Sequence, residues 1–512
     1  MIKKYQQLIV FLTVSMGFAQ VQNVTFTIVP PTFNEDTPIT ITASNVNPSL
    51  WGVTDIYLWA WSSNTAGANQ LDAPNNGTWE NSNEAQKMTN NGNGTYSISF
   101  VPTTFYNRTG IGSIGFLVKA KNGTGDKKSQ DYVTQVGTIV VPPVTEAPVP
   151  AGMKDGINYN SADNSKVTLV LYAPWTQFVY VLGDFNNWET QTSYLLKKDS
   201  AKNRFWIEIT GLTAQQNYGF QYLVDGKIRI ADPYSTTILD EANDKFINSV
   251  TYPNLPPYPT GKTSHAVSLL RTGDAAYNWQ VNNFVKPAKS DLVIYELLIR
   301  DFDALHSFDA VKSRLDYLQS LGINAIELMP ISEFDGNESW GYNPAFHMAL
   351  DKYYGTPNAF KQLVDECHKR GMAVILDVVY NHATGQHPFY RMWNTDGGGY
   401  GGQASADSPF FNPVATHTYS VFNDFNHSKQ ATRDYVKRTT QYWIEEYKID
   451  GFRWDLTKGF TQNCSSTNET CTNATQADRV AVLKQYADYQ WEIDPNFYVI
   501  FEHLGTNEEE TQ

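Results

Sequence analysis

Cysteine, basic charge and long apolar runs are all scarce in this sequence. Only three Cys occur in 512 residues, and none has the His partner and setting that a nucleophilic thiol needs, so cysteine catalysis is excluded. The formal net charge of -14 excludes a nucleic-acid partner, because neutralising phosphates requires clustered Lys and Arg. No stretch reaches the ~18 apolar residues of a membrane span, so no transmembrane segment is predicted.

The first residues predict a secretory signal peptide over residues 1–19. Lys3 and Lys4 precede an apolar run over residues 8–14, and Gly17, Phe18 and Ala19 supply small residues for cleavage after Ala19. We therefore expect a secreted protein, periplasmic or extracellular. In such a protein Cys464 and Cys471, which flank a polar loop, are expected to form a local disulfide. Cys367 lies in an amphipathic stretch and is expected to be a small core residue.

Aromatic residues are abundant, at 14% of an acidic chain. Sugars present apolar faces to Trp and Tyr and hydroxyls to Asp, Asn and Arg, so the composition favours a carbohydrate partner. The alternative is that such a composition is common in secreted β-rich proteins of any function. The length predicts about three domains.

Residues 20–145 are expected to form a β-sandwich, because short alternating runs are separated by Asn- and Gly-rich turns. Trp59 and Trp61 share one face of an expected strand there. They are either a sugar-stacking platform or, as is more usual for aromatic pairs, part of the core. A proline-rich connector over residues 142–150 marks the first boundary. A second β-sandwich is expected over residues 146–262.

Three apolar runs in the last part of the chain each end in polar side chains. The run 373–382 carries Asp377 and ends in Asn381 and His382, and the run 497–503 carries Glu502 near its end. Between them, Gly451 to Asp455 places Arg453 and Asp455 two residues apart and so on one face of a strand. Strand ends of this kind build the catalytic face of a parallel barrel. A buried structural ion pair is the alternative for Arg453 and Asp455.

These three stretches resemble the signature regions of the α-amylase superfamily, retaining glycoside hydrolases with a (β/α)8 barrel that act on α-glucans. The resemblance implies that Asp455 is the nucleophile, Glu502 the general acid/base, and Arg453 the residue that holds Asp455 ionised. It implies that Asp377, His382 and Tyr342 bind the sugar at the cleavage subsite. The partial barrel is expected over residues 263–512, with an insertion at about 383–426.

The second β-rich part resembles the glycogen-binding type of sandwich that precedes the barrel in branching and debranching enzymes. By that resemblance Trp188 stacks on glucan. The match is incomplete, because Lys227 and Ile228 stand where binding members carry a second Trp, and Gln221 stands where a Lys is common. Docking against the barrel is the alternative role for this domain.

Calcium is the one cofactor that the resemblance suggests, with Asn381 as a ligand. The family's insertion after the third strand helps to hold this ion. A Lys-His pair that often follows the nucleophile in the family is Lys458 and Gly459 here, which weakens the expectation.

About five of the barrel's eight strands can be placed, and the family's third carboxylate, an Asp after the seventh strand, has no counterpart. We therefore expect a fragment of a longer protein that is not catalytically competent alone, an inactive truncation being the alternative. The expected function is retaining hydrolysis of starch- or glycogen-type glucans. A branching or transglycosylating enzyme and a non-catalytic surface glucan-binding protein are the alternatives.

Overall fold

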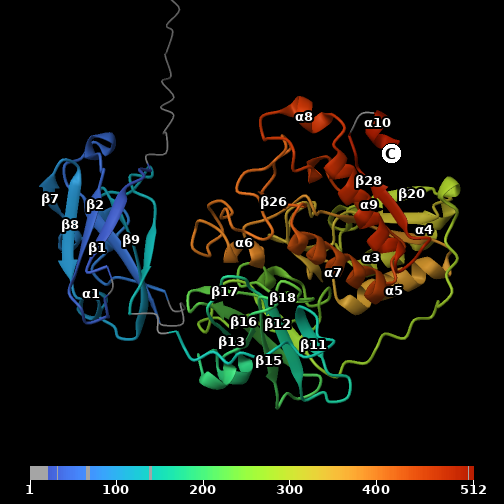
Figure 1. Ribbon diagram of the computed structural model, residues 1–512, viewed down its shortest axis with the longest axis horizontal. Coiled ribbons are helices and arrows are strands. Elements are labelled where there is room, and N and C mark those ends of the chain that lie inside the picture. The colour runs from blue at the N-terminus through green and yellow to red at the C-terminus, as the bar shows by residue number, and fades with distance from the viewer. Residues whose placement is uncertain (1–20, 32, 65–69, 138–140, 505–506, 512) are drawn as a thin grey trace, which may run out of the picture. The chain divides into compact units, whose positions relative to one another are not determined.

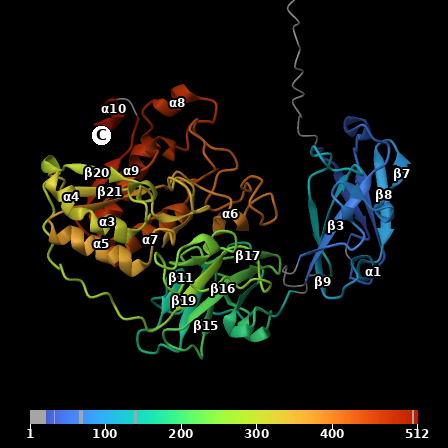
Figure 2. The ribbon, with the colours of Figure 1, turned by 180° about the vertical axis from the view of Figure 1, so that it is seen from behind.

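The computed structural model describes residues 21–31, 33–64, 70–137, 141–504 and 507–511. The predicted signal peptide lies outside the described residues. The chain divides into two compact units, Met1–Val140 and Val141–Gln512 (Figures 1 and 2). No helix among the described residues has the length and apolar character that crossing a membrane requires.

The first unit contains two four-stranded antiparallel sheets. Residues of both, such as Ile41 and Phe116, pack in one core between them. An Asn93-Gly94 turn with positive φ at both residues joins β7 (Thr89–Gly92) to β8 (Thr95–Phe100), as the Asn- and Gly-rich sequence predicts. In spatial order, the strands of one sheet are β1 (Thr25–Val29), β2 (Ile39–Ser44), β8 (Thr95–Phe100) and β7 (Thr89–Gly92). Those of the other sheet are β10 (Tyr132–Gln135), β9 (Ile111–Lys119), β3 (Tyr57–Asn64) and β4 (Leu71–Asp72).

The second unit begins with two further antiparallel sheets, drawn in green in Figure 1. The last strand, β19 (Val267–Arg271), pairs with β16 (Asn217–Val224), so this β-rich part extends to Arg271. The predicted boundary at residue 262 is therefore wrong by one strand. The first sheet comprises β11 (Gly156–Tyr159), β12 (Val167–Tyr172), β15 (Arg204–Ile209) and β14 (Lys197–Asp199), and the second β13 (Val179–Gly183), β16 (Asn217–Val224), β19 (Val267–Arg271) and β18 (Ile238–Leu239), with β17 (Ile228–Ile230) also on β16.

A five-stranded parallel sheet follows, and its strands lie in sequence order. Apolar runs form these strands, and the inner ones are buried in one core with the connecting helices, whereas the first strand is partly exposed. The strands are β20 (Ile294–Leu297), β21 (Ala325–Leu328), β24 (Ala373–Val378), β27 (Gly451–Trp454) and β28 (Tyr498–Phe501). The connecting helices are α3 (Phe308–Ser313), α4 (Leu315–Ser320), α5 (Pro357–Lys369), α7 (Gln430–Tyr447) and α9 (Ala477–Trp491).

Two of the connecting helices differ from the sequence pattern. The apolar spacing over 308–321 predicts one helix, but Arg314 leaves helical geometry at φ -104° and ψ 3° and separates α3 from α4. The apolar residues of α7 predict a helix from Tyr435, but the helix begins at Gln430, because its first turn is polar and carries no apolar signal. Thr356 caps α5, its hydroxyl oxygen accepting a hydrogen bond of 3.1 Å from the Ala359 N–H.

The insertion after β24 packs against the second β-rich part. It includes β25 (His382–Ala383), α6 (Pro388–Met392) and β26 (Asn423–Asp424). Phe389 and Phe410 stack with ring centroids 3.9 Å apart, in one core cluster with Leu171 and Tyr222 of the β-rich part. The predicted domains 146–262 and 263–512 therefore share a core, which favours the docking alternative for the second β-rich part.

Both predictions for the cysteines are confirmed. Cys464 and Cys471 form a disulfide with their Cα atoms 5.7 Å apart. Cys367 is free and fully buried on α5, and burial raises the pKa of its thiol well above the usual value.

Candidate active site

Arg453 contacts three carboxylates that come from three neighbouring strands. Its Nη1 donates to Asp377 at 3.0 and 2.9 Å and to Asp455 Oδ1 at 3.1 Å. Its Nη2 lies 2.7 Å from Glu502 Oε1. The same-face prediction for Arg453 and Asp455 is thus confirmed, and the guanidinium gathers the acidic side chains at the carboxyl ends of β24, β27 and β28.

Strand register and one strained turn place these groups. Asp377 lies opposite Arg453 in the β24–β27 pairing, and Glu502 directly follows β28. Just after the fourth strand, Leu456 takes left-handed geometry at φ 46° and ψ 46°, which is costly for a residue with a side chain. That conformation aims the Leu456 N–H at Glu502 Oε2, 2.9 Å away. The turn therefore fixes Glu502 beside Asp455.

Burial dominates the charge balance of the two aspartates. It raises the pKa of Asp455 to about 6, and the nearby Glu502 carboxyl acts in the same direction. Arg453 opposes this shift, as the sequence led us to expect, but does not overcome it. Burial likewise raises the pKa of Asp377 to about 8, against the lowering effect of Arg453 and of the Tyr342 hydroxyl. Burial therefore favours the protonated forms of both aspartates, and Arg453 favours their ionised forms.

Tyr342 and His382 lie beside Asp377, as predicted. The Tyr342 hydroxyl donates to Asp377 Oδ2 at 2.6 Å. His382 Nε2 lies 2.8 Å from the Tyr342 carbonyl oxygen, so this nitrogen carries a proton, and Nδ1 accepts from Asn381 Nδ2 at 3.1 Å. Burial lowers the pKa of His382 and keeps the ring neutral. The ring is therefore held in one tautomer, with both nitrogens engaged.

The surroundings of Asn381 do not fit a calcium ion. Asn381 Oδ1 is buried without a hydrogen-bond partner, as a ligand atom would be. Calcium, however, takes about six to eight oxygens. The neighbouring carboxylate, Asp424, already lies 2.9 Å from His417 Nε2 through one oxygen and accepts from Asn412 Nδ2 at 2.7 Å through the other. A single free amide oxygen beside an imidazole is a poor donor set for this ion.

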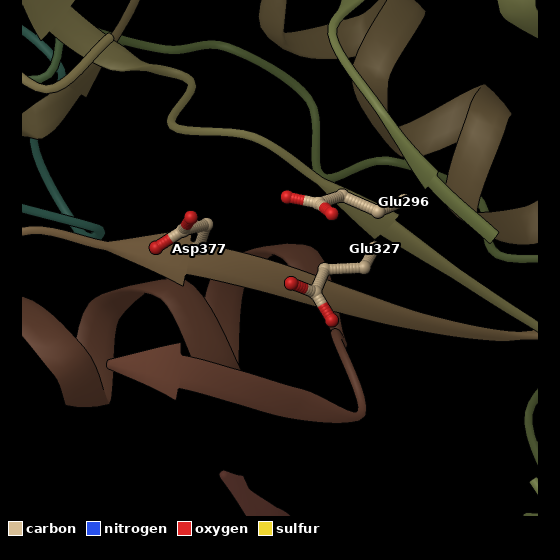
Figure 3. A group of neighbouring side chains, drawn as sticks. All are labelled: Glu296, Glu327 and Asp377. Atoms are coloured by element: carbon tan, nitrogen blue, oxygen red, sulfur yellow. The ribbon is translucent and has the colours of Figure 1, made fainter. Parts of the chain in front are cut away.

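A second acidic group lies next to the site. Oxygens of Glu296, Glu327 and Asp377 lie within 4.8 Å of one another, and Figure 3 shows the three side chains over neighbouring strands. Burial raises the pKa of Glu327, and the Glu296 charge adds to the effect. Asp377 is already bound by Arg453 and Tyr342. The cluster is therefore connected to the Arg453 network through Asp377, whose carboxylate already binds Arg453 and Tyr342.

Trp188 does not have the predicted role. Its side chain is 2% exposed and packs with Leu182, Leu223 and Val267, and its Nε1 donates to Asp184 Oδ1 at 3.0 Å. Stacking on glucan requires an accessible ring face, so the prediction is wrong. The strands that cover Trp188 come from distant parts of the sequence, so the local motif could not reveal its burial.

Phe422 was not identified from the sequence. It lies in the insertion with a positive φ of 48°, is 56% exposed, and its ring centroid is 5.6 Å from that of His382. A bulky exposed aromatic in left-handed geometry beside a polar site is a sign of functional constraint. Only its place next to β26 could have indicated this, because the surrounding sequence carries no distinct motif.

Two family models match parts of this chain. Residues 301–413 match the α-amylase catalytic domain, and residues 155–235 match carbohydrate-binding module 48, the isoamylase N-terminal domain. Residues 301–413 are therefore of the α-amylase catalytic-domain type, and they follow a stretch of the module-48 type. The first match includes Tyr342, Asp377 and His382 and ends before Asp455 and Glu502. The roles of the latter two therefore depend on the geometry described above.

Curated relatives agree with this assignment. The chain is 34% identical over 302 residues to malto-oligosyltrehalose trehalohydrolase of Saccharolobus solfataricus, covering 59% of this chain and 46% of that protein. It is 27% identical over 383 residues to isoamylase 1 of Arabidopsis thaliana, covering 64% and 45%. The chain thus spans about half the length of the curated relatives it matches. These homologues support an amylase-like enzyme.

Solved structures share the fold. A pullulanase from Group B Streptococcus, in complex with maltotetraose, superposes with a TM-score of 0.50 at 21% identity, covering 94% of this chain and 57% of that one. A Paenibacillus barengoltzii pullulanase, also complexed with maltotetraose, gives a TM-score of 0.51 at 19% identity, covering 69% and 53%. The multidomain α-amylase-type fold is therefore common to these proteins.

Proposed function

We propose that the protein hydrolyses α-glucosidic bonds of starch- or glycogen-type glucans with retention of configuration. The contact of Arg453 with Asp377, Asp455 and Glu502 supports this most strongly, because it brings a nucleophile and an acid/base to one point. Retaining glycosidases need two carboxyl groups close together. In the described residues the Asp455 and Glu502 side chains are near enough to interact.

In this mechanism Asp455 attacks the anomeric carbon while Glu502 gives a proton to the leaving glycosidic oxygen. Glu502 then takes a proton from water, which releases the sugar from Asp455. Asp377 and His382 hold sugar hydroxyls, and Tyr342 offers its ring to the sugar face. No step passes through calcium.

The proposal includes architecture and location. The paired antiparallel sheets are two β-sandwiches, and the parallel sheet is part of a (β/α)8 barrel, whose strands likewise follow sequence order. Secretion is supported by the leader-like residues 1–19 and by the Cys464–Cys471 disulfide, which forms in oxidising compartments.

Product analysis of an active preparation tests the activity. Incubation with amylopectin and with linear amylose should release new reducing ends, and Asp455→Asn should lower kcat at least ~10³-fold while glucan binding persists. Glu502→Gln should retain faster turnover on substrates with an activated leaving group, which need no acid. New branches without new reducing ends would show transfer and overturn hydrolysis, and unchanged turnover in Asp455→Asn would overturn the nucleophile assignment.

A further inference from the structure

Strand β3 of the first unit carries two tryptophans on the side that faces away from the core. Leu58 and Ala60 point into the core between the sheets, with exposed fractions of 0%. Trp59 and Trp61 alternate with them, are partly exposed, and are absent from that core. Of the two alternatives for this pair, the core role is therefore wrong.

The neighbouring strand leaves room for Trp61. Gly115 lies opposite Trp61 in the β3–β9 register. A Cβ added at Gly115 would stand 2.1 Å from Nε1 and 2.2 Å from Cε2 of the Trp61 indole. Gly115 has no unusual φ, so the glycine is required by the ring and not by the backbone. The indole therefore lies directly on the backbone of β9.

A third tryptophan belongs to the same face. Trp79 sits in the turn between β5 (Gly77–Thr78) and β6 (Asn81–Ser82), and its ring meets Trp59 edge-on with centroids 5.2 Å apart. A Cβ at Gly123 would stand 2.6 Å from Trp79 Cε2, so here again a glycine makes room for an indole. Two independent glycine contacts thus position two rings.

A buried ammonium group supports this arrangement. Lys119 Nζ lies 5.5 and 5.0 Å from the ring centroids of Trp59 and Trp79. It donates to Ser82 Oγ at 2.7 Å and to the Lys121 carbonyl at 3.0 Å. Because its donors are engaged and its side chain is fully buried, Lys119 holds the rings and is not offered to an anionic ligand.

The polar neighbours select the class of ligand. Asp72 is exposed and lies opposite Trp61 in the β3–β4 register, and Glu80, next to Trp79, is exposed as well. Two nearby lysines, Lys121 and Lys128, pair with Glu84 and Asp131. Acidic groups beside indole rings, with no available cation among these residues, disfavour a polyanion and suit a neutral polyol, whose C–H faces stack on Trp and whose hydroxyls donate to carboxylates.

We propose that Trp59, Trp61 and Trp79, here called the tryptophan platform, bind an α-glucan chain. The choice of α-glucan rests on the proposed function, whereas the platform itself rests on the geometry of the first unit. The platform gives the protein a polysaccharide-binding site on a domain that neither family match covers.

Native gel retardation of the full 512-residue chain in soluble starch tests the proposal. Trp61→Ala should weaken retardation about tenfold or more, as when a central interface tryptophan is truncated. Trp61→Phe, which keeps a ring, should retain most of the binding. Gly115→Ala keeps every tryptophan but displaces the Trp61 ring, and should weaken binding like Trp61→Ala. Trp175→Ala is the matched control, because Trp175 is 65% exposed on the module-48 domain and should leave retardation unchanged.

Circular dichroism and thermal melting of each variant establish that the fold is kept, and Trp79→Ala replaces Trp61→Ala if the latter fails to fold. Starch binding equal to wild type in folded Trp61→Ala and Gly115→Ala would overturn the proposal. Binding of cellulose or xylan but not starch would overturn the α-glucan assignment. A folded protein that keeps Asp455 and Glu502 could bind starch through the platform and yet release no reducing ends. That result would support the platform and contradict the proposed hydrolysis.

Discussion

Gly459 lies against Asn381, so closely that a Cβ added at residue 459 would stand 1.8 Å from Asn381 Oδ1 and 2.8 Å from His417 Cε1. No positive φ requires glycine at this position. The space that a side chain would use is already filled by the Asn381 amide and the His417 ring. Local packing therefore explains why residue 459 is Gly in this chain, at the position where the family often has His.

Gly459→Ala should destabilise the protein by about 1–3 kcal/mol, the usual cost of overpacking a filled interior. Thermal or urea unfolding measures the change. Gly371→Ala is a useful contrast, because no atom lies within 4 Å of a Cβ there and any loss reflects only its φ of 72°. A Gly459→Ala variant as stable as wild type would show that the Asn381 and His417 side chains can move away from residue 459 at little cost in free energy.

Calcium removal should leave stability unchanged. Asn381 Oδ1 is buried without a hydrogen-bond partner among the described residues, and both oxygens of the nearby Asp424 carboxylate are already bound, by His417 and by Asn412. Excess EGTA should therefore not shift the melting temperature, and added calcium should not raise it, since a ligand stabilises only the state it binds. A clear downward shift with EGTA that calcium reverses would contradict this reading of the site.

The strand ends of the candidate site were predictable from sequence, whereas long-range packing was not. Apolar runs ending in Asp377, Arg453 and Glu502 locate the parallel strands because burial on both faces gives continuous apolar stretches. The burial of Trp188 depends on Val267, nearly 80 positions away, and so escapes any local motif. Strand β19 was missed for the same reason, since its partner β16 lies some 50 residues earlier.

Asp455→Asn should stabilise the protein at neutral pH. Burial raises the folded-state pKa of Asp455 to about 6, so holding it ionised above that pH costs free energy. The folded state therefore loses stability relative to the unfolded chain as pH rises through about 4 to 6, and Asn is free of this loss. The expected gain is about 1–2 kcal/mol at pH 7.5 and near zero at pH 4, measured by urea unfolding.

Asp494→Asn provides a control of opposite sign. Although burial opposes it, the bond from Lys286 lowers the pKa of Asp494, so its ionised form favours folding. This variant should be less stable than wild type at pH 7.5 and should approach wild type as pH falls through the carboxyl range. An Asp455→Asn variant that is destabilised at neutral pH would show that the Arg453 contact outweighs burial.

Lys352→Met should destabilise the second unit by about 3–5 kcal/mol at pH 8, because it leaves buried carboxylates without their cation. Lys352 is 2% exposed, binds Glu333, and lies 3.3 Å from Asp244 Oδ1, so it links the second β-rich part, in which Asp244 lies, to the part that holds the parallel sheet. Burial raises the pKa of Glu333 well above its usual value, so the deficit should shrink at pH 5, where this carboxyl group is protonated. Lys312→Met, which removes a partly exposed lysine 2.6 Å from Asp309, should change stability by less than about 1 kcal/mol. The free energy of unfolding of both variants at pH 8 is measured by chemical unfolding. An equal decrease in the two variants would mean that the buried Lys352 cluster does not stabilise the contact between these two parts.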